Sequence, residues 1–343
     1  MHASMIGLDI AKSVFQVHGE DAQGRVVLQK RLRRGQMLAF FAKLEPALVG
    51  MEACGSAHYW ARELSRLGHE VRLIPAAYVK PFVQRNKNDA RDAAGICVAL
   101  GRPDTRLVPV KSPDQQASRG LERSRELLVK QHTQLMNCTR GLLAEHGLVA
   151  AQGRQGFAEL AALVVEGDPR IPAQLRLALA QLLRQLEGLK AAIAALEAEI
   201  IETAKTDPVM RRLSTIPGIG GLTAHAIVAA IGEGRQFASA RDFAAWCGLT
   251  PRQHDTAGRR RTKGISRQGD SGLRKLLALG ASTVMRNARS RPERASEWQR
   301  GILARRPMKV AVLAQAAKNA RIAWAVLTSG QPYRRPASPS ACA

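Results

Sequence analysis

Residues 5–20 read MIGLDIAKSVFQVHGE, and this stretch decides the fold of the N-terminal part of the chain. Its apolar run at 5–10 predicts a buried strand, and 13–19 predicts a second strand directly after it. Further strands are expected at 25–31, 47–52 and 70–75, and helices at 58–67 and 88–100. Strands that alternate with helices over about the first 110 residues predict an α/β layer fold.

Four acidic residues stand out on these predicted elements. Asp9 lies within the first apolar strand, where an ionised carboxylate is costly unless it is paired or binds a cation, and Glu52 ends another apolar strand. Asp89 and Asp92 are three residues apart, so a helix projects them from one face. Together they supply the oxygen-only ligand set that suits Mg²⁺ or Mn²⁺.

Taken singly, each acid is more simply explained as a turn, edge or solvated-face residue. The order of the four along the chain is more specific, because it matches an RNase H-like, RuvC-type arrangement. There, two metal ions about 4 Å apart activate a nucleophile and stabilise the leaving oxygen of a phosphodiester. We therefore predict an α/β RNase H-like (RuvC-type) domain over residues 1–110.

The charge of the chain predicts a polyanionic partner. Lys and Arg number 52 against 28 Asp and Glu, a net charge of +24, and residues 251–343 contribute +16 of it. A surplus of this size indicates nucleic acid. Aromatic residues make up only 4%, which favours contacts to the backbone over stacking on many single-stranded bases.

The cysteines and the hydropathy exclude several classes of protein. The five cysteines form no C-x-x-C pair, which argues against structural zinc and a disulfide framework and predicts a reducing compartment. No apolar run approaches the ~18 residues of a membrane span, and the first residues do not resemble a signal peptide. We expect a cytoplasmic protein without a membrane partner.

Residues 111–206 predict a long helical linker, followed by a mainly α C-terminal domain at 207–331 and a disordered tail at 332–343. Within the linker, apolar residues recur at spacings of four and three. Together they form a heptad-like seam, a stripe of apolar residues along one side of the predicted helix. It consists of Leu182, Leu186, Leu189, Ile193, Leu196 and Ile200. Two interpretations remain open: one helix of an intramolecular hairpin, or a coiled coil that forms a dimer.

Two segments of the C-terminal domain carry polar chemistry. Residues 216–220 read IPGIG between helical stretches, which is the form of a helix-hairpin-helix whose Gly218 and Gly220 let backbone N–H groups approach a phosphate. A simple glycine turn between packed helices is the alternative. Residues 247–275 place hydroxyls at Thr256, Thr262 and Ser266 among cations, so this stretch holds either a nucleophile or a flexible basic loop that touches DNA.

These motifs together resemble the DEDD transposases of the bacterial insertion-sequence family IS110, in its IS1111 branch. The matching stretches are IGLDIAK at 6–12, MEA at 51–53 with Gly55, NKND at 86–89 through Asp92, IPGIG at 216–220, GLTPR at 248–252, ISRQGD at 265–270, and Leu273 with Arg274. Order and spacing agree over nearly the whole chain.

The resemblance implies a RuvC-like domain, a coiled-coil linker and a C-terminal transposase domain. It implies that Asp9, Glu52, Asp89 and Asp92 bind metal, and that a serine of the C-terminal domain attacks DNA to form a covalent phosphoserine. It further implies an element-encoded guide RNA that pairs with DNA, homodimers or homotetramers with shared active sites, and association with the nucleoid.

One departure concerns the nucleophile. Where the family has Ser-Gly, this chain has Thr256-Ala257, so the nucleophile position falls on Thr256, or on Asp255 if the alignment shifts by one. A RuvC-like endonuclease that uses water, and a catalytically inactive nucleic-acid-binding relative, are the alternatives to a recombinase. The residues predicted to bind nucleic acid are Lys12, Lys87, Gly218, Gly220, Arg252, Arg259, Arg260, Arg261, Lys263, Arg267 and Arg274.

Overall fold

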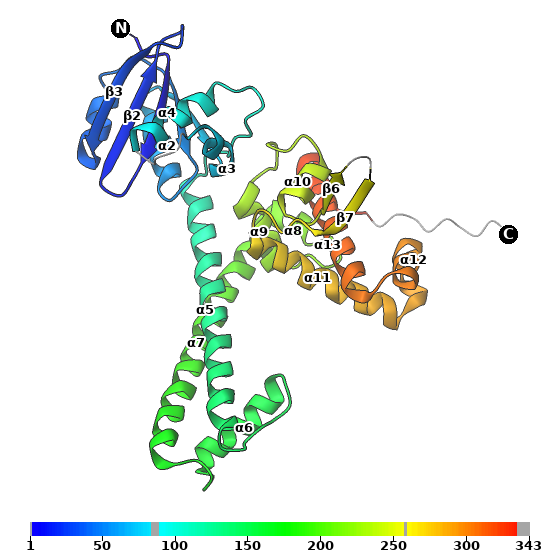
Figure 1. The fold of residues 1–343 in the computed structure, drawn as a ribbon. Helices are drawn as coiled ribbons and strands as arrows, with labels where there is room; N and C mark the ends of the chain where they lie inside the picture. Colours follow the sequence, from blue (N-terminus) through cyan, green and yellow to red (C-terminus); the bar gives the residue numbers. More distant parts are fainter. Residues whose placement is uncertain (1, 84–88, 257–258, 335–343) are drawn as a thin grey trace, which may run out of the picture. The chain divides into compact units, whose positions relative to one another are not determined.

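The computed structural model describes residues 2–83, 89–256 and 259–334, and only the backbone of 89–90, 254–256 and 259–263. The chain divides into two compact units, Met1–Asp114 and Gln115–Ala343 (Figure 1). The boundary lies four residues beyond the one expected at 110. The predicted linker and C-terminal domain fall within one unit, because the last linker helix packs against helices that follow it.

The N-terminal unit is built on a five-stranded sheet. Its strands are β1 (Met5–Ile10), β2 (Val14–Glu20), β3 (Val26–Arg33), β4 (Leu48–Glu52) and β5 (Glu70–Ile74), in the order β3-β2-β1-β4-β5. The first three strands pair antiparallel, and β4 and β5 continue the sheet parallel to β1. The five predicted strands are confirmed, with bounds that differ by at most two residues.

Helices cover both faces of this sheet. On one face, Leu8 and Met51 share a core with Phe41, Trp60 and Leu64, which come from the helices that follow β3 and β4. The other face carries the helix predicted at 88–100. The helical segments are η1 (Arg34–Gln36), α1 (Met37–Phe41), α2 (Ala57–Arg66), α3 (Ala76–Val79), η2 (Lys80–Phe82) and α4 (Asp89–Leu100).

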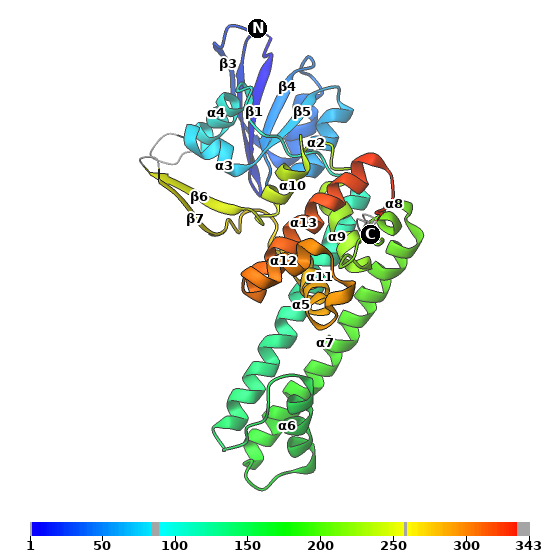
Figure 2. The ribbon, with the colours of Figure 1, turned by 90° about the vertical axis from the view of Figure 1, so that its right-hand side faces the viewer.

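The second unit begins with a long helical hairpin. It consists of α5 (Pro113–Ala144), α6 (Arg154–Glu166) and α7 (Ala173–Thr206), and both views show α6 at the end where α5 turns back into α7 (Figure 2). Arg125 of α5 forms an ion pair with Glu197 of α7. In the predicted seam, Leu186 and Ile200 are buried and the other four residues are half-buried. The helices therefore form an intramolecular hairpin, while pairing between chains stays a prediction.

The rest of the second unit is mainly helical, as predicted. Its core joins Ile227, Phe243, Leu277 and Ala320, which come from four different helices. The elements are α8 (Pro208–Leu213), α9 (Gly221–Ile231), α10 (Ala240–Trp246), β6 (Pro251–Thr256), β7 (Arg259–Ile265), α11 (Ser271–Ser290), η3 (Pro292–Arg294), α12 (Glu297–Arg305) and α13 (Met308–Ser329). Among the described residues, no helix has the length and apolarity that crossing a membrane requires.

Candidate active site

Asp9 and Glu52 lie side by side in the N-terminal sheet. Leu8 of β1 pairs with Met51 of β4 in a parallel ladder, and both side chains are fully buried on one face. Because side chains alternate along a strand, the next residues on the two strands, Asp9 and Glu52, project together from the opposite face. Both are half-buried. The structure therefore brings two of the four predicted carboxylates to one point at the end of adjacent strands.

Helix α4 packs on the face from which these acids project. Gly7 and Gly50 lie two residues before Asp9 and Glu52 and so share their face. A Cβ atom on Gly7 would lie 2.1 Å from the carbonyl oxygen of Ala93, and one on Gly50 would lie 2.9 Å from Leu100 Cδ2. The two glycines therefore allow the helix to approach the sheet closely.

The first turn of α4 lies at the end of β1 where Asp9 is located. At the end of the helix, a Cβ on Gly101 would lie 3.7 Å from Met5 Cε, whereas Ala93 lies over Gly7. The helix thus runs antiparallel to β1, and the turn from Asp89 to Asp92 extends beyond Gly7. Asp92 is half-buried, and the side chain of Asp89 lies outside the described residues.

The Cys54 thiol gives a second sign that the two strand carboxylates lie together. Partial burial raises its pKa, and the negative charges of Glu52 and Asp9 raise it further. A single thiol feels both charges only if both carboxylates lie near it, since such interactions weaken with distance. The sequence showed only that the cysteines form no zinc-binding pair, and it did not place Cys54 at this site.

Metal binding by the four acids remains a prediction. Carboxylate oxygens suit Mg²⁺, and the sheet and α4 direct the acids toward one region. Among the residues whose side chains are described, no group of three or more His, Cys, Asp and Glu is placed to hold a metal ion. Asp89 is not among those side chains, whereas Asp9, Glu52 and Asp92 are.

Thr256 ends the first strand of a β-hairpin. Strand β6 pairs antiparallel with β7, and Thr256 lies opposite Arg259 in the register. Residues 257–258, which connect the strands, lie outside the described residues, as do the side chains of 254–263. The predicted cations Arg259, Arg260, Arg261 and Lys263 are therefore placed by their backbone alone, along β7.

Two arginines hold the base of this hairpin. The Arg252 guanidinium donates to the carbonyl oxygen of Ser266 at 2.9 and 3.2 Å. Arg274 donates to the carbonyl oxygens of Cys247 at 3.0 Å and Gln268 at 2.7 Å. Both were predicted to bind nucleic acid, and the structure shows that both bind backbone oxygens of the protein. A phosphate contact in addition to these bonds stays a prediction.

The two glycines of the IPGIG motif differ in their surroundings. Gly218 has a φ of +87°, and a Cβ there would lie 2.9 Å from the carbonyl oxygen of Gly280 in α11. It therefore serves close packing, as the glycine-turn interpretation expects. Gly220 is exposed at the start of α9, with open space where a Cβ would be. Its phosphate contact stays a prediction.

The remaining predicted contacts are placed as follows. Lys12 and Arg267 are exposed. Arg267 has a φ of +57° and donates its backbone N–H to the carbonyl oxygen of Gly248 at 3.1 Å, so it turns the chain at the base of the hairpin. Lys87 lies outside the described residues.

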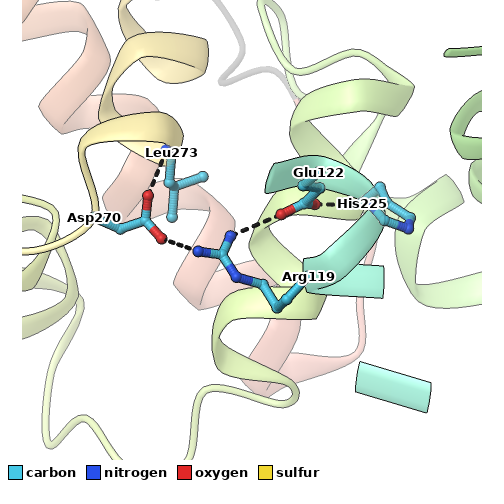
Figure 3. Close-up of polar contacts among 5 residues, drawn as sticks. All are labelled: Arg119, Glu122, His225, Asp270 and Leu273. Atoms are coloured by element: carbon cyan, nitrogen blue, oxygen red, sulfur yellow. Dashed lines mark hydrogen bonds and ion pairs between the residues drawn. The ribbon is translucent and has the colours of Figure 1, made fainter. Parts of the chain in front are cut away.

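A polar network anchors α5 to the C-terminal helices (Figure 3). Arg119 binds Glu122 at 2.7 Å and also pairs with Asp270, while His225 Nδ1 lies 2.8 Å from Glu122 Oε1. Asp270 in turn accepts from the backbone N–H of Leu273 at 2.9 Å and so caps α11. The network thereby joins α5, α9 and the segment between β7 and α11. Sequence reasoning missed it because His225 and Asp270 lie more than 100 residues beyond their partners on α5.

Replacing Arg119 with Met is expected to lower the free energy of unfolding by about 3 kcal/mol, because two mostly buried carboxylates, Glu122 and Asp270, then face each other without a cation. Urea denaturation followed by circular dichroism measures the loss. Arg123→Met is the matched control, since Arg123 is exposed on the same helix. Equal stability of the two variants would contradict a structural role for the network.

Comparisons with known proteins place the chain among transposases. A DEDD transposase family model of the IS110 type matches residues 6–147, and the model "Transposase IS116/IS110/IS902 family" matches residues 210–297. A "Probable family 20 transposase" from Pseudomonas aeruginosa is 48% identical, over 97% of this chain and 99% of its own length. The transposase for insertion sequence element IS1111A from Coxiella burnetii is 38% identical, over 96% of this chain and 91% of its own length.

Proposed function

This chain belongs to the IS110 family of insertion-sequence transposases and is a DNA transposase, and from that premise we propose that Asp9, Glu52, Asp89 and Asp92 hold two Mg²⁺ ions. The shared register of Asp9 and Glu52, on the sheet face that α4 covers, is the observation that supports this proposal most. A bound metal pair would polarise a phosphodiester and neutralise charge that develops on its oxygens. The four acids would serve to hold and space the ions.

We further propose that Thr256 is the nucleophile. Its hydroxyl oxygen attacks phosphorus, so that an Oγ–P bond forms and one ester P–O bond of the DNA breaks. The threonine releases its proton, and the leaving oxygen of the DNA takes one up. The arginines of β7 support this role, because cations beside a hydroxyl bind phosphate and favour the alkoxide. The extra methyl group of threonine makes the attack more crowded than with serine.

Thr256→Ala is expected to abolish both the covalent protein–DNA adduct and strand transfer, because no hydroxyl remains to form the ester. Thr256→Ser should keep both. The measurement is a denaturing gel after reaction with the element's own flanking DNA and RNA, which resolves adducts from nicked products.

Thr262→Ala and Ser266→Ala are the matched controls, since each removes another hydroxyl of the same stretch. Normal recombination by Thr256→Ala would overturn the assignment. Nicking with no adduct in the unsubstituted protein would instead support a RuvC-like endonuclease that uses water. Salt-sensitive binding without nicking or adduct, unchanged by Mg²⁺, would support a catalytically inactive relative.

The rate at which Cys54 is alkylated reports Mg²⁺ binding and does not depend on catalytic activity. The carboxylates of Glu52 and Asp9 raise the pKa of this thiol, so less thiolate is present at a given pH. Asp9→Asn removes one negative charge, which lowers the pKa, and alkylation of Cys54 by iodoacetamide should become faster at pH ~8. Mg²⁺ should accelerate alkylation of the unsubstituted protein in the same direction, because it neutralises the same charges.

Cys97 is an internal control for this measurement. Burial raises its pKa to about 12, so its alkylation should stay slow in every sample. Mass spectrometry of the two peptides gives both rates. If Mg²⁺ accelerates Cys54 equally in the unsubstituted protein and in Asp9→Asn, the cation does not act through Asp9 and the proposed metal site is wrong.

We also propose that an element-encoded RNA directs the choice of DNA site, that the active form is a homodimer or homotetramer on DNA, and that the protein works in the nucleoid. The net charge of +24 supports binding of more than one nucleic-acid strand. Gel-mobility shifts with the RNA transcribed beside the coding region test the first point. The mass of the complex in light scattering tests the second.

A further inference from the structure

The far end of α11 belongs to a small lobe with an unusual concentration of positive charge. Residues 286–309 comprise the last turns of α11, η3, α12 and the first residues of α13, and we call them the basic lobe. Its Ile302 packs in a small core with Met285 and Ala311, which lie just outside the two ends of the lobe in the sequence. The lobe contains eight Lys and Arg residues against two Glu, so 24 residues carry +6 of the net charge of +24.

Most of these cations have no carboxylate partner. All eight are exposed, and among the described residues no ion pair is formed by Arg286, Arg289, Arg291, Arg305, Arg306 or Lys309. By contrast, Arg300 donates to the carbonyl oxygens of Pro292 and Ala295 and helps to shape the lobe. Like charges gathered without counterions repel each other, so the surface suits a polyanion.

The lobe offers no platform for stacking bases. Trp298 is its one aromatic residue; it is half-buried, and the ammonium group of Lys318 lies 4.4 Å from the centre of its ring. That cation occupies a ring face that a base would need. Contacts from exposed Arg and Lys side chains to phosphate oxygens are therefore the chemistry that this surface supplies, and such contacts position a duplex without reading its sequence.

Helix α11 sets the separation between the lobe and the base of the β6–β7 hairpin. It begins at Ser271, directly after the base of the β6–β7 hairpin, and ends at Ser290 within the lobe. Its 20 residues span about 30 Å at ~1.5 Å per residue. In both views, β6, β7 and α12 lie on the same side of the C-terminal unit (Figures 1 and 2).

We infer that the basic lobe binds the phosphate backbone of duplex DNA about one helical turn away from the base of the hairpin that engages the reacting phosphodiester. About 30 Å corresponds to ~9 base pairs at 3.4 Å per pair, close to the ~10 base pairs of one turn. Phosphates one turn apart lie on the same face of a duplex, so a straight duplex can contact both surfaces. The inference rests on the proposed role of Thr256 only for the place of the reacting phosphodiester.

A charge-neutralised lobe tests this inference. The variant carries Arg289→Gln, Arg305→Gln, Arg306→Gln and Lys309→Gln. The matched control removes the same charge from exposed residues of the helical hairpin, through Lys130→Gln, Arg154→Gln, Arg184→Gln and Lys190→Gln. Binding is measured in EDTA, without catalysis, to a long duplex of the element's terminus and to one cut back to ~5 base pairs on either side of the exchanged phosphodiester.

The lobe variant is expected to bind the long duplex with a smaller salt dependence. The slope of log K against log salt should fall by about 3 for three to four lost phosphate contacts. It should match the unsubstituted protein on the short duplex, and the control should match it on both. Ethylation interference should show phosphates one turn from the exchange point that matter for the unsubstituted protein and not for the lobe variant.

Three outcomes would overturn the inference: an equal loss on the short duplex, an equal loss in the control, or a loss confined to the element's RNA. The proposed catalytic role fails separately. Thr256→Ala could recombine normally while the lobe variant shows the smaller salt dependence expected above. In that case the lobe binds DNA, and only the assignment of Thr256 as the nucleophile is wrong.

Discussion

Asp9→Asn is expected to lower the rate of strand transfer by at least a thousandfold, or about 4 kcal/mol of activation free energy. The substitution replaces a charged oxygen of the proposed metal pair with an amide of nearly the same shape, so the site keeps its volume and loses a unit of negative charge. Metal ions stabilise developing charge on a phosphodiester by several kcal/mol, so losing one ion removes most of the acceleration. The measurement is the rate of strand transfer at saturating Mg²⁺.

The control separates lost chemistry from lost folding. Asp104→Asn makes the same change at an exposed position of the same unit and should leave the rate unchanged. Both variants should bind DNA in EDTA as the unsubstituted protein does, because binding in the absence of metal does not use the acids. Strand transfer by Asp9→Asn within tenfold of the unsubstituted rate would contradict the metal site.

Gly7→Ala is expected to destabilise the N-terminal unit by about 3 kcal/mol and to abolish strand transfer in the fraction that stays folded. The new methyl group would lie 2.1 Å from the carbonyl oxygen of Ala93 and 2.8 Å from the backbone nitrogen of Cys97. Both are backbone atoms of α4, so the helix as a whole must move away from the sheet. Asp92 moves with it, which separates the helix acid from Asp9 and Glu52.

Thermal unfolding and strand transfer, measured on the same preparation, check this result. Gly35→Ala is the matched control, because a Cβ at Gly35 meets no atom within 4 Å. A Gly7→Ala protein that retains full activity would show that the position of α4 does not control the site. Loss of stability in Gly35→Ala of the same size would show that the effect is not specific to the contact with α4.

The sequence predicted the N-terminal sheet well because its strands are apolar runs. The run at 5–10 became β1 without change, and the expected neighbour of Asp9, Glu52, lies on the adjacent strand. That adjacency could be predicted only as a hypothesis, since strand order depends on contacts between residues distant in the chain. Helices α1 and α3 were missed because segments of five and four residues carry too few turns to show a period.

The C-terminal site was less predictable. The hairpin of β6 and β7 has no alternation of apolar and polar residues, so nothing local indicates strands. Its base depends on Arg252 and Arg274, whose hydrogen bonds reach backbone oxygens 14 and 27 residues away. A charge pattern shows that arginines are present, but not whether they bind phosphate or the protein itself.

The carboxylate of Asp270 has two structural roles at once, and these limit which residues can replace it during evolution. One of its oxygens caps α11 through Leu273, and the other pairs with Arg119 of α5. Asparagine would keep the cap and lose the ion pair, whereas glutamate is a poor cap because its longer side chain does not fold back onto its own helix. Neutral drift at this site therefore requires a compensating change at Arg119, so the two positions should vary together among relatives.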